Sequence, residues 1–199
     1  MEEEIEESYQ MFLYCNNLEE FLLLWNSFYE NKIYVPGYLS KFVGAEDNPE
    51  ATFEMGKKFQ EITKLGVICT GSQVTIPNTQ KGYITAFIPV KIRQKLVENL
   101  NRYSGIVAFN SKIFYEQECY EGHDSIYVTY DKNGKGYSRV YAGDGGDFGT
   151  FSFIRKYLNN AMCKIFNSSN YCLLTIVSPS YESSPEYHID VLLECLNVN

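Results

Sequence analysis

The sequence lacks several features that mark common classes of protein. It has two histidines, one tryptophan and no Cys-x-x-Cys pair. It has no run of about 18 apolar residues, the length that crosses a bilayer as a helix. Its start, MEEEIEE, lacks the basic residues and the apolar stretch of a secretory signal peptide. We therefore expect a protein that is neither secreted nor bound to a membrane, and a cytoplasmic location.

Positive charge is also scarce. The 199 residues carry 17 Lys and Arg against 25 Asp and Glu, a formal net charge of −8. Nucleic-acid binding relies on clustered basic side chains that neutralise phosphates. The densest basic run comprises Lys91, Arg93, Lys95 and Arg102, which spread around one predicted helix. The sequence therefore disfavours nucleic acid as a partner and favours a protein or a small molecule.

The six cysteines form no recognisable metal or disulfide pattern. Most of them lie in apolar segments, where a thiol packs as a small hydrophobic side chain. Because the chain is long and carries no export signal, we expect reduced thiols. A structural zinc site needs closely spaced ligands, which the sequence does not offer. We therefore expect no metal and no cofactor.

Helix signals are strong in the first third of the chain. Residues 1–16 are predicted to be an acidic leader and a short lead-in. Asn17 and Glu20 then have the spacing of a capping box, which predicts the start of a helix. Apolar residues follow at three- and four-residue steps on its core-facing side: Leu18, Phe21, Leu22, Trp25, Phe28 and Tyr29. A second helix is predicted from Asn48-Pro49-Glu50 to Gly66, a residue type that often ends helices.

The rest of the chain alternates short apolar strands with helices. Asn133-Gly134 predicts a hairpin turn, because both residue types tolerate positive φ. Strands are predicted at about 67–70, 82–88, 106–109, 126–130, 137–141 and 171–177, and helices at about 90–101, 151–166 and 186–196. The order strand-strand-helix-strand occurs twice. We predict an α/β (α+β) fold as a single domain over 17–199, with a mixed sheet of about six strands covered by four to five helices.

The best candidate binding site follows the first predicted strand. Thr70, Ser72 and Gln73 lie at the end of that strand, and Gln80 precedes the next one. In α/β sheets, ligands favour the loops outside the strand ends. These four residues are therefore predicted to bind a ligand, with a purely polar turn as the alternative.

Three residues are candidates for catalysis: Ser72, His123 and His188. A histidine can act as a general base on a nearby hydroxyl or thiol. Cys119 lies four residues before His123, so a cysteine–histidine pair is one arrangement that the sequence permits. The alternative is an exposed loop histidine with no chemical role.

Two further motifs mimic known sites but lack essential residues. Asp131 to Gly136 resembles the start of a calcium loop, yet Lys135 and Ala142 would occupy ligand positions. This segment is therefore predicted to be a hairpin turn. The glycine-rich segment from Gly143 to Thr150 precedes a predicted helix, but it carries two aspartates and no lysine. It is predicted to be a connector.

The order of these motifs resembles a family of small uncharacterised proteins, a domain of unknown function found mainly in actinobacteria. The resemblance covers about residues 17–196, and Thr70-Gly71-Ser72-Gln73 is its most specific part. The other matching segments are the Leu18–Trp25 helix, Pro36-Gly37-Tyr38, Glu50, Gly66, Gln80–Phe87, the hairpin around 126–141 and the final strand, loop and helix. The family has no established activity, so the resemblance implies a shared fold and no reaction.

The leading functional hypothesis is a non-enzymatic recognition or protein-interaction module, with its contact surface near Ser72, Gln73 and Gln80. The alternative is a small-molecule or nucleotide-processing enzyme that uses Thr70 to Gln73, with a histidine as general base. A second alternative is a minor structural component of a virion. It rests on the high tyrosine content, 17 of 199 residues, which is typical of AT-rich coding sequences of large viruses.

Overall fold

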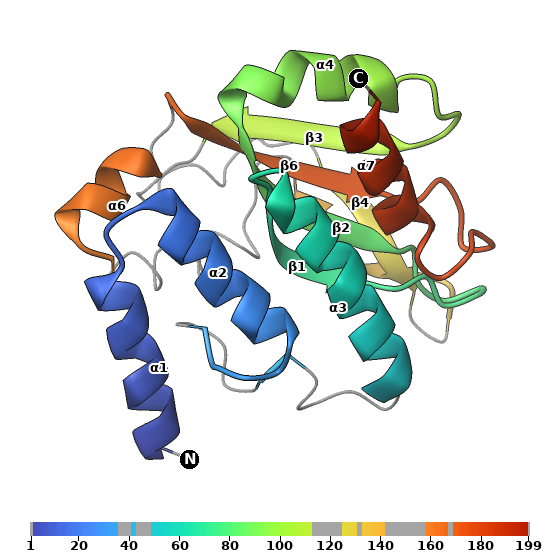
Figure 1. Cartoon of the computed structure of the whole chain (residues 1–199). Helices are drawn as coiled ribbons and strands as arrows, with labels where there is room; N and C mark the ends of the chain where they lie inside the picture. Colours follow the sequence, from blue (N-terminus) through green and yellow to red (C-terminus); the bar gives the residue numbers. More distant parts are fainter. Residues whose placement is uncertain are drawn as a thin grey trace. The chain divides into compact units, whose positions relative to one another are not determined.

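The computed structural model describes residues 2–35, 41–42, 49–112, 125–130, 133–141, 158–166 and 169–198 (Figure 1). Within these residues the fold is mixed α/β, with six helices and six strands. The chain divides into two compact units. Unit 1 comprises Met1–Ile68 and Gly149–Asn167, and unit 2 comprises Cys69–Phe148 and Ser168–Asn199. The single domain expected over 17–199 stays a prediction.

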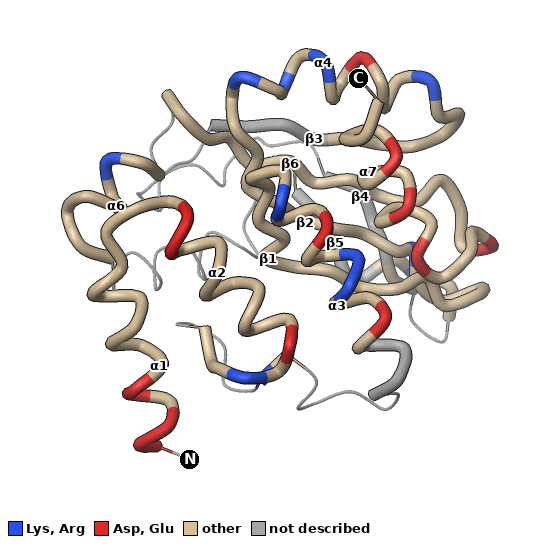
Figure 2. The backbone as a smooth tube through the Cα atoms, in the orientation of Figure 1, with Lys and Arg blue, Asp and Glu red and all other residues tan. Residues whose placement is uncertain are grey.

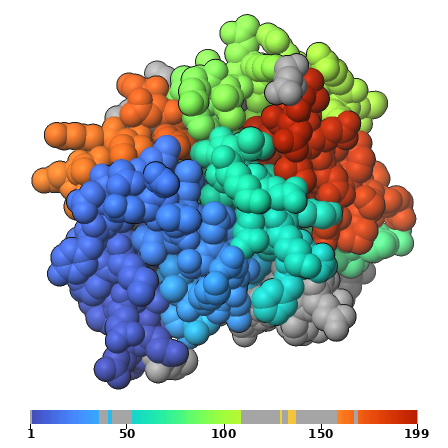
Figure 3. All heavy atoms as spheres, in the orientation of Figure 1, coloured from blue at the N-terminus to red at the C-terminus, as the bar shows by residue number. Residues whose placement is uncertain are grey.

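Unit 1 is helical in its described residues, with α1 (Glu2–Tyr14), α2 (Leu18–Tyr29), α3 (Pro49–Lys64) and α6 (Asn160–Ile165). Helices α2 and α3 lie side by side (Figure 3). Their core is a cluster of aromatic rings with centroids 4.7 to 6.3 Å apart, mostly tilted or edge to face, the arrangements that ring quadrupoles favour. The rings belong to Phe12, Phe21, Trp25, Phe28, Tyr29, Phe42, Phe59 and Phe166.

The two helix starts predicted in this unit are confirmed. At α2, the backbone N–H of Glu20 donates to Asn17 Oδ1 at 2.9 Å. The Glu20 carboxylate in return accepts from the backbone N–H of Asn16, one residue earlier than in the usual capping box. Helix α3 begins at Pro49, and Gly66 follows its end with φ of +79°, a left-handed conformation that glycine adopts without strain.

The acidic start of the chain differs from the expected solvated leader, because it forms helix α1 with Ser8, Tyr9 and Phe12 buried. Three glutamates in its first turn suit the positive end of the helix dipole. The hydroxyl of Ser8 donates to the Glu4 carbonyl and accepts from the backbone N–H of Tyr34 at 3.2 Å. The many glutamates obscure an apolar spacing of four and three residues (Ile5, Tyr9, Phe12) that would have predicted this helix.

One residue, Asn159, joins the start of α6 to the end of α1. Its side-chain oxygen accepts from the backbone N–H groups of Ala161 and Met162, at 3.0 and 3.1 Å. Its side-chain nitrogen donates to the carbonyl groups of Leu13 and Cys15. The side-chain amide of Asn159 therefore caps the amino end of α6. It also satisfies carbonyl groups at the end of α1 that have no partner within that helix.

Unit 2 contains a four-stranded sheet in the order β1-β2-β6-β3. Its strands are β1 (Ile68–Gln73), which starts at the boundary between the units, β2 (Tyr83–Pro89), β6 (Tyr171–Val177) and β3 (Val107–Lys112). Strands β2 and β3 both pair with β6 in the antiparallel sense. Every residue of β6 is buried. Because successive strand residues point to opposite faces, both faces of the sheet are covered at this strand.

The expected single sheet of about six strands is wrong. Strands β4 (Ser125–Tyr130) and β5 (Gly136–Tyr141) form the predicted hairpin, but they make a separate two-stranded sheet. Their pairing shifts register around Thr129, and an isolated bridge joins Thr129 to Gln80. Register shifts of this kind bend a ladder. The element order repeats as predicted, and β6 of the second half joins the sheet of the first half, whereas β4 and β5 do not.

The centre of the main sheet carries polar groups that bond to one another. Thr85 and Thr175 face each other across β2 and β6, with their hydroxyl oxygens 3.1 Å apart. Thr70 on β1 donates to the Thr85 carbonyl at 3.5 Å. Helices α4 (Val90–Leu100) and α7 (Tyr187–Asn197) pack against β2 and β6. The sheet therefore provides a rigid support on which these two helices are fixed.

We expect Asn159→Ala to lower the free energy of unfolding by about 2 kcal/mol, because it removes the cap of α6 and the bonds to the end of α1. Asn159→Ser keeps a capping oxygen but cannot reach the α1 carbonyls, so it should lose about half as much. Urea denaturation of the three proteins measures this difference. Equal stability of the alanine variant and the native chain would contradict the role given to Asn159.

Candidate functional site

The four residues predicted to bind a ligand lie at the end of β1 and in the connection to β2. Thr70 is buried and bonded within the sheet, and the side-chain amide of Gln80 donates to the Val74 carbonyl at 2.9 Å. Ser72 is half-buried and Gln73 is exposed. Two of the four residues are thus used to hold the β1–β2 connection together. That this segment binds a ligand stays a prediction.

Of the three catalytic candidates, His123 lies outside the described residues, and His188 is fully buried at the start of α7. The hydroxyl that meets His188 is that of Ser178 and not that of Ser72: Ser178 Oγ lies 3.2 Å from His188 Nδ1. Thr75 Oγ1 lies 3.5 Å from Ser178 Oγ and accepts from the backbone N–H of Gly82 at 3.0 Å. The structure therefore brings His188 into a chain of buried polar groups.

This chain of four residues, Thr75, Gly82, Ser178 and His188, is called the His188 anchor below. It has no room for another atom: a Cβ added at Gly82 would lie 2.4 Å from His188 Nδ1 and 2.7 Å from Thr75 Oγ1. Ser178 exposes 1% and His188 0% of its surface. A substrate could not reach this serine–histidine contact without displacing α7. The arrangement therefore holds the start of α7 against the ends of β2 and β6.

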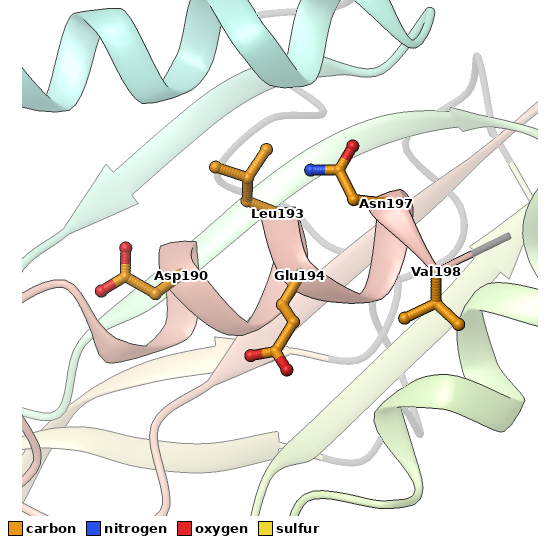
Figure 4. Close-up of a pocket in the computed structure, with 5 residues that line it drawn as sticks. All are labelled: Asp190, Leu193, Glu194, Asn197 and Val198. Carbon is orange, nitrogen blue, oxygen red and sulfur yellow. The ribbon is translucent and has the colours of Figure 1, made fainter.

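The opposite side of α7 faces solvent. The helix buries His188, Ile189, Val191, Leu192 and Cys195. A shallow hollow of about 430 Å³, here called the α7 hollow, is lined by Asp190, Leu193, Glu194 and Asn197 of this helix and by Val198, which follows it. Figure 4 shows that Glu194 and Val198 lie one turn apart on one side, and Leu193 and Asn197 on the other. Carboxylate, amide and aliphatic groups thus alternate over one small surface.

Helix α7 itself carries carboxylates and no lysine or arginine, although Arg102 lies near enough to Cys195 to lower the pKa of its thiol. Glu186, Asp190 and Glu194 follow at four-residue steps, which places them in one row. Figure 2 shows red segments along α7. Like charges at this spacing destabilise a helix by about 0.2–0.5 kcal/mol per pair. The row therefore slightly destabilises α7 in isolation, and a cation bound beside it would remove that cost.

Tyr103, which follows α4, is a hydrogen-bond partner of Glu194, one of the residues that line the hollow. Burial, together with its hydrogen bond to Glu194, raises the pKa of Tyr103 to about 12. The phenol is protonated near neutral pH and can donate to Glu194. A carboxylate has two oxygens with about four acceptor sites, so Glu194 can accept a further hydrogen bond from a second donor.

Within the described part of the chain, no group of three or more histidine, cysteine and acidic residues is arranged to hold a metal ion. None of the helices described there is long and apolar enough to cross a bilayer. The five cysteines described, Cys15, Cys69, Cys163, Cys172 and Cys195, are free thiols.

Sequence reasoning missed the α7 hollow: Asp190 and Glu194, which line it, are not among the residues predicted to bind a ligand. A signal was present: Glu182, Glu186, Asp190 and Glu194 follow at four-residue intervals. On a helix this spacing gives an acidic row opposite the apolar residues that face the core.

Comparison with protein-family models finds none that matches the chain, and comparison with curated proteins finds no significant match. The resemblance to the actinobacterial family of unknown function therefore stays a prediction. The function has to be argued from the described side chains.

We expect Gly82→Ala to destabilise the protein by about 1–3 kcal/mol, because the added methyl group overlaps the ring of His188. The same substitution in a His188→Ala background should cost less, since the ring is gone. Thermal unfolding of the two single variants and the double variant measures this coupling. Strictly additive losses would show that Gly82 and His188 do not constrain each other.

Burial raises the pKa of the Cys172 and Cys195 thiols from 9.0 to about 11. As the pH rises from about 9 to 11, the unfolded chain loses these protons first, so the free energy of unfolding should fall over this range. Urea denaturation across that range measures the fall. The fall in the free energy of unfolding should be smaller in the double variant Cys172→Ala/Cys195→Ala. The variant Cys163→Ala is the control, because it also removes a cysteine but should show the same fall as the native chain. An equal fall in the double variant would contradict this assignment.

Proposed function

We propose that this protein is a non-enzymatic recognition module that binds a basic segment of a partner protein in the α7 hollow. The observation that carries the proposal is the composition of that hollow: two carboxylates, Asp190 and Glu194, stand beside the aliphatic side chains of Leu193 and Val198. A lysine or arginine has the matching chemistry, because its apolar stem can pack on aliphatic groups while its charged head meets carboxylates.

The rigid setting of α7 supports this proposal. The His188 anchor holds the start of the helix, and near its end the side-chain amide of Asn99 donates to the Cys195 carbonyl at 3.0 Å. Both ends of the helix are thus fixed to unit 2 by buried hydrogen bonds. A recognition surface on a rigid element loses less entropy on binding than one on a loop.

Recognition is favoured over an enzyme that uses His188 as its general base by the position of this histidine. A general base must lie within hydrogen-bond reach of the proton that it removes. His188 is enclosed, and its ring nitrogen Nδ1 faces Ser178 inside the protein. The proposal keeps the module expected from the sequence but places its contact surface on α7 and not near Ser72, Gln73 and Gln80.

A protein segment fits the hollow better than a free polyamine does. The hollow is shallow and open, and its aliphatic groups add binding energy only when a larger apolar surface covers them. A segment with a lysine or arginine next to a leucine would use both kinds of group. Because the charges are exposed, the affinity should fall as the salt concentration rises.

The test uses a short synthetic peptide with lysine and leucine at helical four-residue spacing, titrated calorimetrically against the full chain. Asp190→Asn/Glu194→Gln keeps the shape of the hollow and removes its charge, so it should weaken binding by about tenfold or more. Glu61→Lys, an exposed charge change on α3, is the control and should bind like the native chain. A peptide in which glutamine replaces lysine should bind weakly to all three.

Two outcomes would contradict the proposal. One is equal affinity of the native chain and the neutral double variant for the lysine peptide. The other is tight binding of spermidine with no binding of the peptide, which would indicate a small-molecule site.

A further inference from the structure

Helix α4 carries a basic surface in a protein that is otherwise acidic. Lys91 and Lys95 lie one turn apart on its exposed side, and Arg102, also exposed, follows the end of the helix. These three residues are called the α4 ridge here. The only carboxylate on α4, that of Glu98, accepts a hydrogen bond from the side-chain amide of Gln94 at 3.0 Å. Figure 2 shows blue segments along α4 and red segments along α7.

The charge of the α4 ridge is not neutralised within the described part of the chain. The protein has 25 acidic residues for 17 basic ones, so carboxylates are in excess. Ion pairs form on other elements, such as those of Lys41 with Glu4 and of Lys32 with Glu30. No cation of the ridge has an ion-pair partner among the described residues. The ridge therefore keeps its charge for another molecule.

The carboxylates of α7 are close to α4 in the same copy, but the ridge does not pair with them. The two helices are joined by the side-chain amide of Asn99, which donates to the Cys195 carbonyl, and by the hydrogen bond of Tyr103 with Glu194. These bonds hold the inner sides of the helices together and leave Lys91 and Lys95 exposed. One unit thus presents a basic and an acidic surface on two neighbouring helices.

We propose that the basic segment bound by the α7 hollow is helix α4 of a second copy of this chain. This inference rests on the function proposed above, because it uses the same hollow. The spacing of the charges matches: Lys91 and Lys95 are four residues apart on α4, and Asp190 and Glu194 are four residues apart on α7. Four residues rise by about 6 Å along a helix, so each lysine can meet one carboxylate when the helices are packed together.

The aliphatic groups of the hollow suit the same occupant. Leu193 and Val198 stand beside the carboxylates. The four-carbon stems of Lys91 and Lys95 can pack on these groups while their ammonium groups reach the carboxylates. The hollow therefore contacts both parts of each lysine of the ridge.

A pair of copies can form this contact twice. Because each copy carries both surfaces on adjacent helices, a two-fold axis would place α4 of each copy on α7 of the other, and such a contact closes as a dimer. The net charge of −8 on each copy opposes association. The dimer should therefore be weak and depend on protein concentration, which leaves the α7 hollow open to other basic segments in dilute solution.

The test is sedimentation of the full chain over a range of concentrations, with two charge-reversed variants. Lys91→Glu/Lys95→Glu and Asp190→Lys/Glu194→Lys each place like charges opposite one another, so each should weaken self-association by about tenfold or more. A mixture of the two variants restores opposite charges at both contacts. It should associate at least as well as the native chain.

The matched control is Lys57→Glu/Lys64→Glu on α3. It changes the net charge by the same amount as the reversal on α4, and both lysines are exposed. It should associate like the native chain. Circular dichroism checks that each variant is folded. Lys91→Gln/Lys95→Gln, which removes the charges without reversing them, should show a smaller loss and serves as the second variant if a reversed helix does not fold.

Three results would overturn the inference. The first is a native chain that stays monomeric at every concentration while the lysine- and leucine-containing peptide still binds, in which case the α7 hollow keeps its proposed function. The second is self-association that neither reversal weakens, or a mixture of the reversed variants that does not associate. The third is a monomeric native chain whose α4 ridge binds an acidic peptide, which would assign the ridge to an acidic partner. Absence of both the dimer and peptide binding would overturn the proposed function as well.

Discussion

The contact of Gly82 with His188 is the constraint on which the outer surface of unit 2 depends. The ring of His188 fits against the backbone of Gly82 because glycine has no side chain, and its Nδ1 meets the hydroxyl of Ser178. This contact sets the rotation of α7 about its own axis. With His188 inward, Leu192 and Cys195 also point inward, and Asp190 and Glu194 must point outward. The composition of the α7 hollow is therefore a consequence of a buried contact on the other side of the helix.

Local signals in the sequence were sufficient for most of the elements. Asn17 and Glu20 identified the start of α2, and the continuous apolar run from Tyr171 to Val177 identified β6 with its exact bounds. The failures have physical causes. Helix α1 was missed because its glutamates mask the spacing of Tyr9 and Phe12. The separation of β4–β5 from the main sheet could not be predicted, because strand pairing depends on contacts between distant segments.

The candidate sites were harder to predict than the elements, for the same reason. His188 is adjacent to Ile189 and Asp190 in the sequence, which suggests reactive chemistry, but its environment is set by Gly82 and Ser178 from two other segments. The acidic row of α7 is visible as a periodic pattern, yet its meaning depends on which side of the helix is buried. Periodicity in the sequence shows which residues share one side of a helix or strand. Only the tertiary packing shows which side is buried and which side is exposed to a partner.

Unit 2 presents surfaces of both signs. Helix α7 offers carboxylates beside aliphatic groups, and α4 offers the exposed cations of the α4 ridge. The two helices are joined on their inner sides, where the side chain of Asn99 bonds to the Cys195 carbonyl.

The most direct measurement of the central claim is a map of backbone amide chemical shifts while a lysine- and leucine-containing peptide is added to isotope-labelled protein. The account predicts shifts concentrated on the amides from Asp190 to Val198, while the amide of Gly82, which donates inside the His188 anchor, stays unchanged. Shifts centred instead on the β1–β2 connection from Thr70 to Gln80, or no shifts at all, would contradict it.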